Sequence, residues 1–279
     1  MTRFANNFKT AMLLGGMMAL FIVVGSAWGR EGMILGLLLG GLMNVGAWFF
    51  SDKIAIAAMR GKEVHSDAGG AEGELYRMVD DLRRRAGLPM PRVYICPHEA
   101  PNAFATGRSP KRAAVAVTVG AMRLLDHHEL AGVMAHELAH VKNRDTLISC
   151  IAATISGVLA FVAQWGMFLG GNRNGNPLVM FLTVILAAVG AALIKAMISR
   201  SREFVADADG ATIAGTPNGL IGALAKLEAY AKRIPLVQPN PAMNNLFIIE
   251  PFAGNQVIRL FATHPPTEAR IEALRALRR

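Results

Sequence analysis

Five consecutive residues, His136 to His140, place two histidines and one glutamate in the order H-E-L-A-H. On a helix, side chains four residues apart lie on the same face, one turn above each other. The two imidazoles can therefore hold one metal ion between them, with Glu137 next to the open coordination position. The pattern H-E-x-x-H is typical of zinc peptidases, in which the glutamate acts as the general base.

The residues that precede this motif favour a helix. Asp126 is a suitable N-cap, and Glu129 follows three positions later, as in a capping box. No proline interrupts the run from His127 to Ser149. We therefore predict that one helix carries both histidines, although the motif alone also fits a chance match on a solvated helix.

A catalytic zinc ion typically has three protein ligands and one open position. Glu203 is the best candidate for the third ligand, and Asp207, four residues later, shares its helix face. One of these carboxylates could bind the metal while the other orients a ligand histidine. Spacing alone leaves open the alternative that both are surface acids balanced by Arg200 and Arg202.

Four long apolar blocks separate the polar parts of the chain, and only Lys195 brings a charge into them. Each block is close to the roughly 20 residues that a helix needs to cross the hydrocarbon core. Because core helices are seldom uncharged on every face, we predict four transmembrane helices, within residues 11–29, 32–50, 147–170 and 178–199. A cleaved signal peptide is the alternative for the first block. Because only Arg30 and Glu31 separate it from the second block, a retained helical hairpin is favoured.

The charges that flank these blocks predict their orientation. Lysine and arginine gather on one side of the predicted membrane, whereas the other side carries only Arg30 and Arg173. Cytoplasmic loops carry the excess of positive charge, so we expect both termini and the H-E-x-x-H motif in the cytoplasm. A continuous helix would place His140 about 10 Å and Glu203 about 6 Å from the membrane, so a membrane hairpin would bring these ligands to similar heights.

Composition narrows the kinds of partner. The chain has 279 residues, of which 53% are apolar, and a net charge of +9. Much of this charge flanks the apolar blocks, where it would meet the anionic lipid of a bilayer. A nucleic-acid site would need a basic patch with interleaved aromatic residues, and with three Tyr and three Trp in the chain we expect no nucleic-acid partner. Cys96 and Cys150 offer neither a disulfide framework nor a metal site.

Four ordered motifs together carry a family resemblance. They are N-A-F-A-T-G at residues 102–107, H-E-L-A-H-V-K-N-R-D at 136–145, R-E-F-V-A-D at 202–207 and T-H-P-P at 263–266. With the apolar blocks, this pattern resembles the HtpX family of membrane-bound zinc proteases, which are related to the CAAX prenyl endopeptidases. The resemblance implies a gluzincin-type fold, one zinc ion (Zn2+) per chain bound by His136, His140 and Glu203, and a role in membrane-protein quality control under stress.

We therefore expect a mainly α fold with a small β-sheet (α+β), in which a gluzincin-type metalloprotease domain is combined with four transmembrane helices. The expected order is a transmembrane hairpin, a cytoplasmic protease part with the motif helix, a second hairpin and a protease part with the third ligand, at residues 1–50, 51–146, 147–199 and 200–279. The soluble parts predict strands at 92–96, 102–107 and 113–119 and helices at 72–86, 202–214, 218–232 and 266–279. The last helix would have Ile271, Leu274 and Leu277 on one face.

Two further features complete the candidate site. The resemblance suggests that residues 102–107 form an edge strand that pairs with the backbone of an extended substrate, so that the cleft is lined by Asn102, Ala103, Phe104, Ala105 and Thr106. An ordinary core strand is the alternative. His264 is a candidate hydrogen-bond donor to the tetrahedral oxyanion, and the alternative is a structural histidine that caps the last helix.

These features predict a membrane-anchored zinc endopeptidase of the cell inner membrane, and the family resemblance implies that it cleaves misfolded or damaged membrane proteins at the cytoplasmic face. Zinc would lower the pKa of a bound water and polarise the scissile carbonyl, and Glu137 would pass the proton of that water to the leaving amine. The alternatives are a non-catalytic membrane scaffold, which has no need of Glu137, and a CAAX-type prenyl-protein endopeptidase, for which more spans are expected. Intramembrane charge is too sparse to favour a transporter, and nothing in the sequence specifies an oligomeric state.

Overall fold

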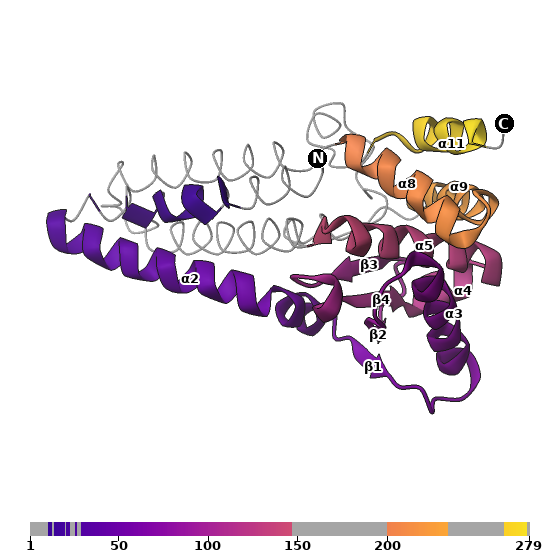
Figure 1. Ribbon diagram of the computed structural model, residues 1–279, viewed down its shortest axis with the longest axis horizontal. Coiled ribbons are helices and arrows are strands. Elements are labelled where there is room, and N and C mark those ends of the chain that lie inside the picture. The colour runs from indigo at the N-terminus through magenta and orange to yellow at the C-terminus, as the bar shows by residue number, and fades with distance from the viewer. Residues whose placement is uncertain are drawn as a thin grey trace.

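The computed structural model describes residues 29–146, 200–233 and 265–277, together with parts of 11–26 (Figure 1). The strands are β1 (Lys62–Val64), β2 (Arg92–Cys96), β3 (Ala103–Thr106) and β4 (Ala114–Thr118). The helices are α2 (Gly29–Ala58), α3 (Gly70–Ala86), α4 (Val119–Leu124), α5 (His127–Asn143), α8 (Arg200–Ala214), α9 (Asn218–Arg233) and α11 (Thr267–Ala276), with a short 3-10 turn at Pro110–Arg112.

The four strands form one mixed sheet in the order β1-β2-β4-β3. Strands β2 and β4 are parallel, with Val93 opposite Val115, whereas β1 and β3 pair antiparallel with their neighbours. Strand β3 therefore lies at one edge of the described sheet. A mainly helical fold with a small sheet is confirmed, and β1 is an addition that the sequence did not predict.

The two faces of the sheet are covered by different helices. Side chains that alternate along β2 and β4, such as Val93 and Val115, belong to a large core shared with α3, α5, α8 and α9. The intervening residues, such as Tyr94 and Ala116, pack on the other face against Ile56 and other side chains at the end of α2. This alternation follows from the period of two in a strand, and it attaches the apolar helix α2 to the sheet.

Helix α5 lies at the centre of the large core, between the sheet and the pair α8 and α9 (Figure 1). Glycines allow the three helices to approach closely. A Cβ on Gly210 of α8 would lie 2.9 Å from the Cα of His136, and a Cβ on Gly132 of α5 would lie 2.4 Å from the backbone of Leu220. The absence of side chains at these positions therefore sets the spacing of the helices that carry the candidate ligands.

Most predicted elements are confirmed, with two corrections at helix ends. Asp126 caps α5, and Glu129 completes the capping box. However, α5 ends at Asn143 because Arg144 adopts a left-handed conformation with φ of 61°, so the assumption of a continuous helix from His140 into the next apolar block is wrong. Helix α11 ends at Ala276, and Leu277, which was expected on the same apolar face as the buried Leu274, is its C-cap and is 52% exposed.

The predicted membrane spans fall only partly on the described residues. Blocks 147–170 and 178–199 lie outside them, block 11–29 is described in part, and block 32–50 belongs to α2. Among the described residues, no helix combines the length and apolar character needed to cross a membrane. The four spans and the division of the chain at residues 50, 146 and 199 stay predictions.

Candidate active site

Helices α5 and α8 bring three metal-ligating side chains to one point. Nε2 of His136 and Nε2 of His140 lie 3.1 Å apart. The two carboxylate oxygens of Glu203 complete the group, because Oε2 lies 3.7 Å from Nε2 of His136 and Oε1 lies 3.6 Å from Nε2 of His140. The structure therefore assembles the three residues that the sequence nominated as ligands, and they are positioned to bind a metal ion.

The carboxylates that lie beside the two imidazoles fit a cation between the rings. Nδ1 of His136 lies 2.9 Å from a carboxylate oxygen of Asp207, and Nδ1 of His140 lies 3.2 Å from one of Asp145. A proton on each Nδ1 leaves a lone pair on each Nε2. Two such lone pairs facing each other repel unless a cation lies between them, either a metal ion or a proton on one of the two nitrogens. A tetrahedral zinc ion with Zn–N bonds of about 2.0–2.1 Å would hold two nitrogens about 3.3 Å apart, close to the observed spacing.

A buried arginine supports the carboxylate that holds His136. Arg270 of α11 is 1% exposed, and its Nε and Nη2 donate to the two oxygens of Asp207 at 2.8 and 2.6 Å. Its Nη1 lies 3.5 Å from Oε2 of Glu203. Burial alone would raise the pKa of Asp207, but the hydrogen bonds from Arg270 and His136 lower it, so the carboxylate stays ionised and able to orient the imidazole.

His140 has an equivalent arrangement on the other side of the site. Its carboxylate partner Asp145 is buried, and Nη1 of Arg202 lies 3.6 Å from the second oxygen of Asp145. Burial opposes protonation of His140, but the hydrogen bond to Asp145 and the charges of Glu203 and Glu137 outweigh it and raise the pKa to about 9. The surroundings of this imidazole thus favour a positive charge, which a bound metal ion would supply.

Glu137 lies within the same buried site, on the side of the sheet. It is 6% exposed, and its carboxylate accepts a hydrogen bond from the backbone N–H of Ala105 on β3. Burial raises the pKa of Glu137, while the nearby histidines oppose this shift and Glu203 adds to it. A carboxylate with a raised pKa is a stronger base, which suits a residue that must accept a proton.

Strand β3 turns alternate backbone groups toward its outer edge. The carbonyl of Asn102 accepts from the N–H of Thr118 at 2.9 Å, so Asn102 faces β4. Because backbone directions alternate along an antiparallel strand, Ala103 and Ala105 direct their N–H and C=O groups away from β4, and the N–H of Ala105 reaches Glu137. The side chains of all four β3 residues are buried, with Phe104 among the side chains that pack on the end of α2.

The structure also identifies supporting residues that the sequence analysis did not assign. Asp145 lies within the motif at residues 136–145, but no role was predicted for it from the sequence. Its position five residues after His140 could have indicated a carboxylate partner for this imidazole. Arg270 was harder to identify, because the sequence shows it only as a single arginine on the inward face of a short helix. His264, the candidate oxyanion donor, lies outside the described residues.

Two histidines one turn apart on a helix, joined by a glutamate from a second helix, define the metal site of a metallopeptidase. The chain belongs to peptidase family M48, whose family model matches residues 70–278. The resemblance to HtpX proteases is confirmed, the protein is a protease, and the family implies a metal ion in the site described above.

Relatives of high identity share almost the full length of the chain. A protein named Protease HtpX homolog from Desulfatibacillum aliphaticivorans is 50% identical, over 98% of this chain and 90% of its own. Proteins of the same name from Nostoc punctiforme and Syntrophobacter fumaroxidans are 48% and 46% identical, over 96% and 98% of this chain and 95% and 99% of theirs.

A solved structure shares the fold at low sequence identity. The crystal structure of S. mikatae Ste24p matches with a TM-score of 0.53 at 16% identity. The match covers 98% of this chain and 66% of the Ste24p chain. This chain thus spans slightly less than two thirds of Ste24p, and the likeness concerns the fold.

Proposed function

We propose that this protease is a zinc-dependent endopeptidase of the cell inner membrane that cleaves misfolded or damaged membrane proteins at the cytoplasmic face. The observation that carries the proposal is the convergence of two imidazoles and one carboxylate beside the buried Glu137. Nitrogen and oxygen ligands of this kind suit zinc. A scaffold without catalysis would have no use for a carboxylate placed beside such a site.

The chain's own residues account for the proton transfers of peptide hydrolysis. His136, His140 and Glu203 would hold a zinc ion, which would supply a Lewis acid and lower the pKa of water. Glu137, with its raised pKa, accepts the proton of the attacking water and delivers it to the leaving amine. Asp207 and Asp145 keep both imidazoles in the tautomer that presents Nε2 to the metal.

We further propose that the outer edge of β3 receives the substrate as an added strand. The outward backbone groups of Ala103 and the outward carbonyl of Ala105 are suited to pair with an extended peptide. The β3 side chains are buried, so recognition through this edge would depend on the substrate's backbone rather than its sequence. Such a mode suits the cleavage of many different unfolded segments. Asn102 and Thr106 would flank the bound strand, and His264 stays a proposed oxyanion donor.

Substitution of Glu137 by glutamine tests the chemical part of the proposal. The variant keeps the shape of the side chain but cannot accept the proton, so kcat should fall by about 10²–10⁴-fold in casein cleavage by the detergent-solubilised protein. Its zinc content should equal that of the wild type, because Glu137 is not a ligand. Wild-type turnover by a zinc-loaded Glu137→Gln variant would overturn the assignment.

The membrane part of the proposal rests on the apolar blocks and on the exposed apolar side chains of α2. Leu38 and Leu42 are 64% and 69% exposed, and apolar surface of this extent marks a membrane or a partner. A site close to a bilayer would meet substrates that are still embedded or just emerging. One cleavable sequence should therefore be cut faster when it is tethered to a transmembrane helix in the same vesicle than when it is free. Equal rates would count against this substrate class.

A further inference from the structure

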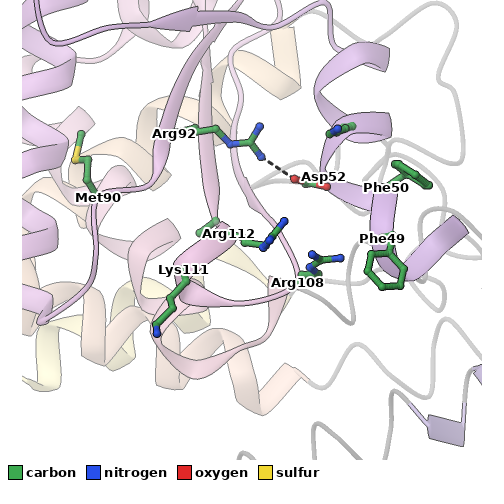
Figure 2. A pocket seen from close by; sticks show the side chains of 10 residues that line it. Phe49, Phe50, Asp52, Met90, Arg92, Arg108, Lys111 and Arg112 are labelled. Atoms are coloured by element: carbon green, nitrogen blue, oxygen red, sulfur yellow. Dashed lines mark hydrogen bonds and ion pairs between the residues drawn. The ribbon is translucent and has the colours of Figure 1, made fainter. Parts of the chain in front are cut away.

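A cavity of about 340 Å³ lies where helix α2 meets the end of the sheet, and none of the candidate metal ligands lines it. Its lining includes five cationic side chains and one carboxylate. The carboxylate, Asp52, is already paired with Arg92 at 2.6 Å. Figure 2 shows the guanidinium groups of Arg92, Arg108 and Arg112 on the side of the cavity that faces α2, whereas Lys111 points away. The cavity is therefore strongly positive, with more cations than the described carboxylates neutralise.

Arg108 is held at the edge of this cavity by an aromatic ring. Its guanidinium group lies 4.5 Å from the ring centroid of Phe49, a cation–π contact that orients the group. Its buried Nη1 has no hydrogen-bond partner among the described residues. A buried guanidinium nitrogen normally finds an acceptor, so this N–H is available to an acceptor that the described residues do not supply.

The position of the cavity along α2 indicates where that acceptor comes from. Large apolar side chains are exposed along α2 from Met33 to Phe50. One turn later, Ala55 and Ile56 are buried against the sheet, whereas Ile54 is still 48% exposed. The cavity lies at this change, beside Phe49, Phe50 and Asp52. A bilayer that covered the exposed apolar part of α2 would place its headgroups at the level of the cavity.

We propose that this cavity binds the phosphate of an anionic phospholipid headgroup. The phosphate would accept hydrogen bonds from Arg108 and Arg112, while the acyl chains would lie along the apolar surface of α2. Basic pockets at the cytoplasmic ends of membrane helices take anionic headgroups in this way. The inference rests on the membrane attachment proposed above but not on the protease chemistry. Such a site would fix the height of the protease domain over the bilayer.

The test compares short-chain lipids on the full-length protein in neutral detergent. Dihexanoylphosphatidylglycerol, dihexanoylphosphatidylcholine and glycerol 3-phosphate are titrated against fluorescently labelled protein by thermophoresis. Wild type should bind the anionic lipid more tightly than the zwitterionic one. The variant Arg108→Gln/Arg112→Gln should bind the anionic lipid about 25-fold more weakly, at about fivefold for each cation near the headgroup. A matched control, Arg77→Gln/Arg275→Gln, removes two exposed cations that do not line the cavity and should bind like wild type.

Three outcomes would overturn the proposal. An unchanged preference in the cavity variant excludes the site, and equal losses in both variants indicate diffuse surface charge. Glycerol 3-phosphate bound as tightly as the lipid would indicate a site for free phosphate. The charge-retaining variant Arg108→Lys/Arg112→Lys should recover most of the binding, which a merely misfolded cavity variant cannot explain. The cavity variant should cleave casein at the wild-type rate. The Glu137→Gln variant should keep the wild-type preference for the anionic lipid. The two assays therefore distinguish a failure of the lipid site from a failure of the protease assignment.

Discussion

Replacing Gly210 by alanine tests whether the close approach of α5 and α8 sets the geometry of the metal site. A Cβ at this position would lie 2.9 Å from Cα and 3.0 Å from the backbone nitrogen of His136. Ordinary contacts of this kind begin at 3.4 Å. Both contacting atoms belong to the backbone and cannot rotate away. The two helices must therefore separate by about 0.5 Å, since packed interiors have no space to absorb the methyl group.

This displacement acts on the ligands because they lie on both helices. Glu203 is on α8 with Gly210, whereas His136 and His140 are on α5. Catalytic groups must be held within about 0.5 Å of their productive geometry, and a displacement of 1 Å can cost about 100-fold. We therefore expect kcat/KM to fall about tenfold. Alanine gains about 1 kcal/mol of helix propensity over glycine, but overpacking costs about 1–3 kcal/mol, so the free energy of unfolding should change little or fall by up to about 2 kcal/mol.

The assay combines casein cleavage, zinc content and thermal unfolding for Gly210→Ala and for a control, Gly46→Ala. A Cβ on Gly46 meets no atom within 4 Å, so the control should keep wild-type kcat/KM. A loss of activity that exceeds the loss of stability in Gly210→Ala would support the geometric argument. Wild-type kcat/KM together with wild-type zinc content in Gly210→Ala would refute it.

Three further predictions concern buried groups. Arg270→Met should destabilise the fold by about 3–5 kcal/mol, since it leaves the carboxylate of Asp207 buried without its partner; a denaturant melt measures the loss, and additivity with Asp207→Asn in a double-mutant cycle would contradict the pairing. Asp145→Asn should weaken zinc affinity about 10–100-fold in chelator competition, because it withdraws the carboxylate that orients His140; unchanged affinity would show that Asp145 has no such role. Burial raises the pKa of Cys96 to about 11, so in a Cys150→Ser background this thiol should resist iodoacetamide at pH 8 until the protein is denatured, and rapid labelling of the native protein would contradict its burial.

Helix α5 could be predicted because its signals are local. The capping box of Asp126 and Glu129 and the spacing of His136 and His140 all lie within one helix, and the structure has the same pairings. The end of the same helix was not predictable, because Arg144 adopts a left-handed conformation without the glycine that usually marks it.

The third ligand could not be chosen from local spacing, because the choice depends on how two distant helices pack. Glu203 faces the imidazoles while Asp207 lies behind one of them, an arrangement fixed by the close approach at Gly210. Arg270 was missed for a related reason. A short helix with an apolar stripe predicts an apolar contact, and only the assembled site shows that the space it enters holds two buried carboxylates.

The central claim is tested most directly by the zinc content per chain. It is measured by plasma mass spectrometry on wild type, Glu203→Ala and Glu137→Gln purified in parallel. Three ligands from two helices, with the general base outside the ligand set, predict about one zinc per chain in wild type and in Glu137→Gln. The same arrangement predicts a strongly reduced content in Glu203→Ala. Full zinc content in Glu203→Ala, or loss of zinc in Glu137→Gln, would contradict the assignment of ligand and base.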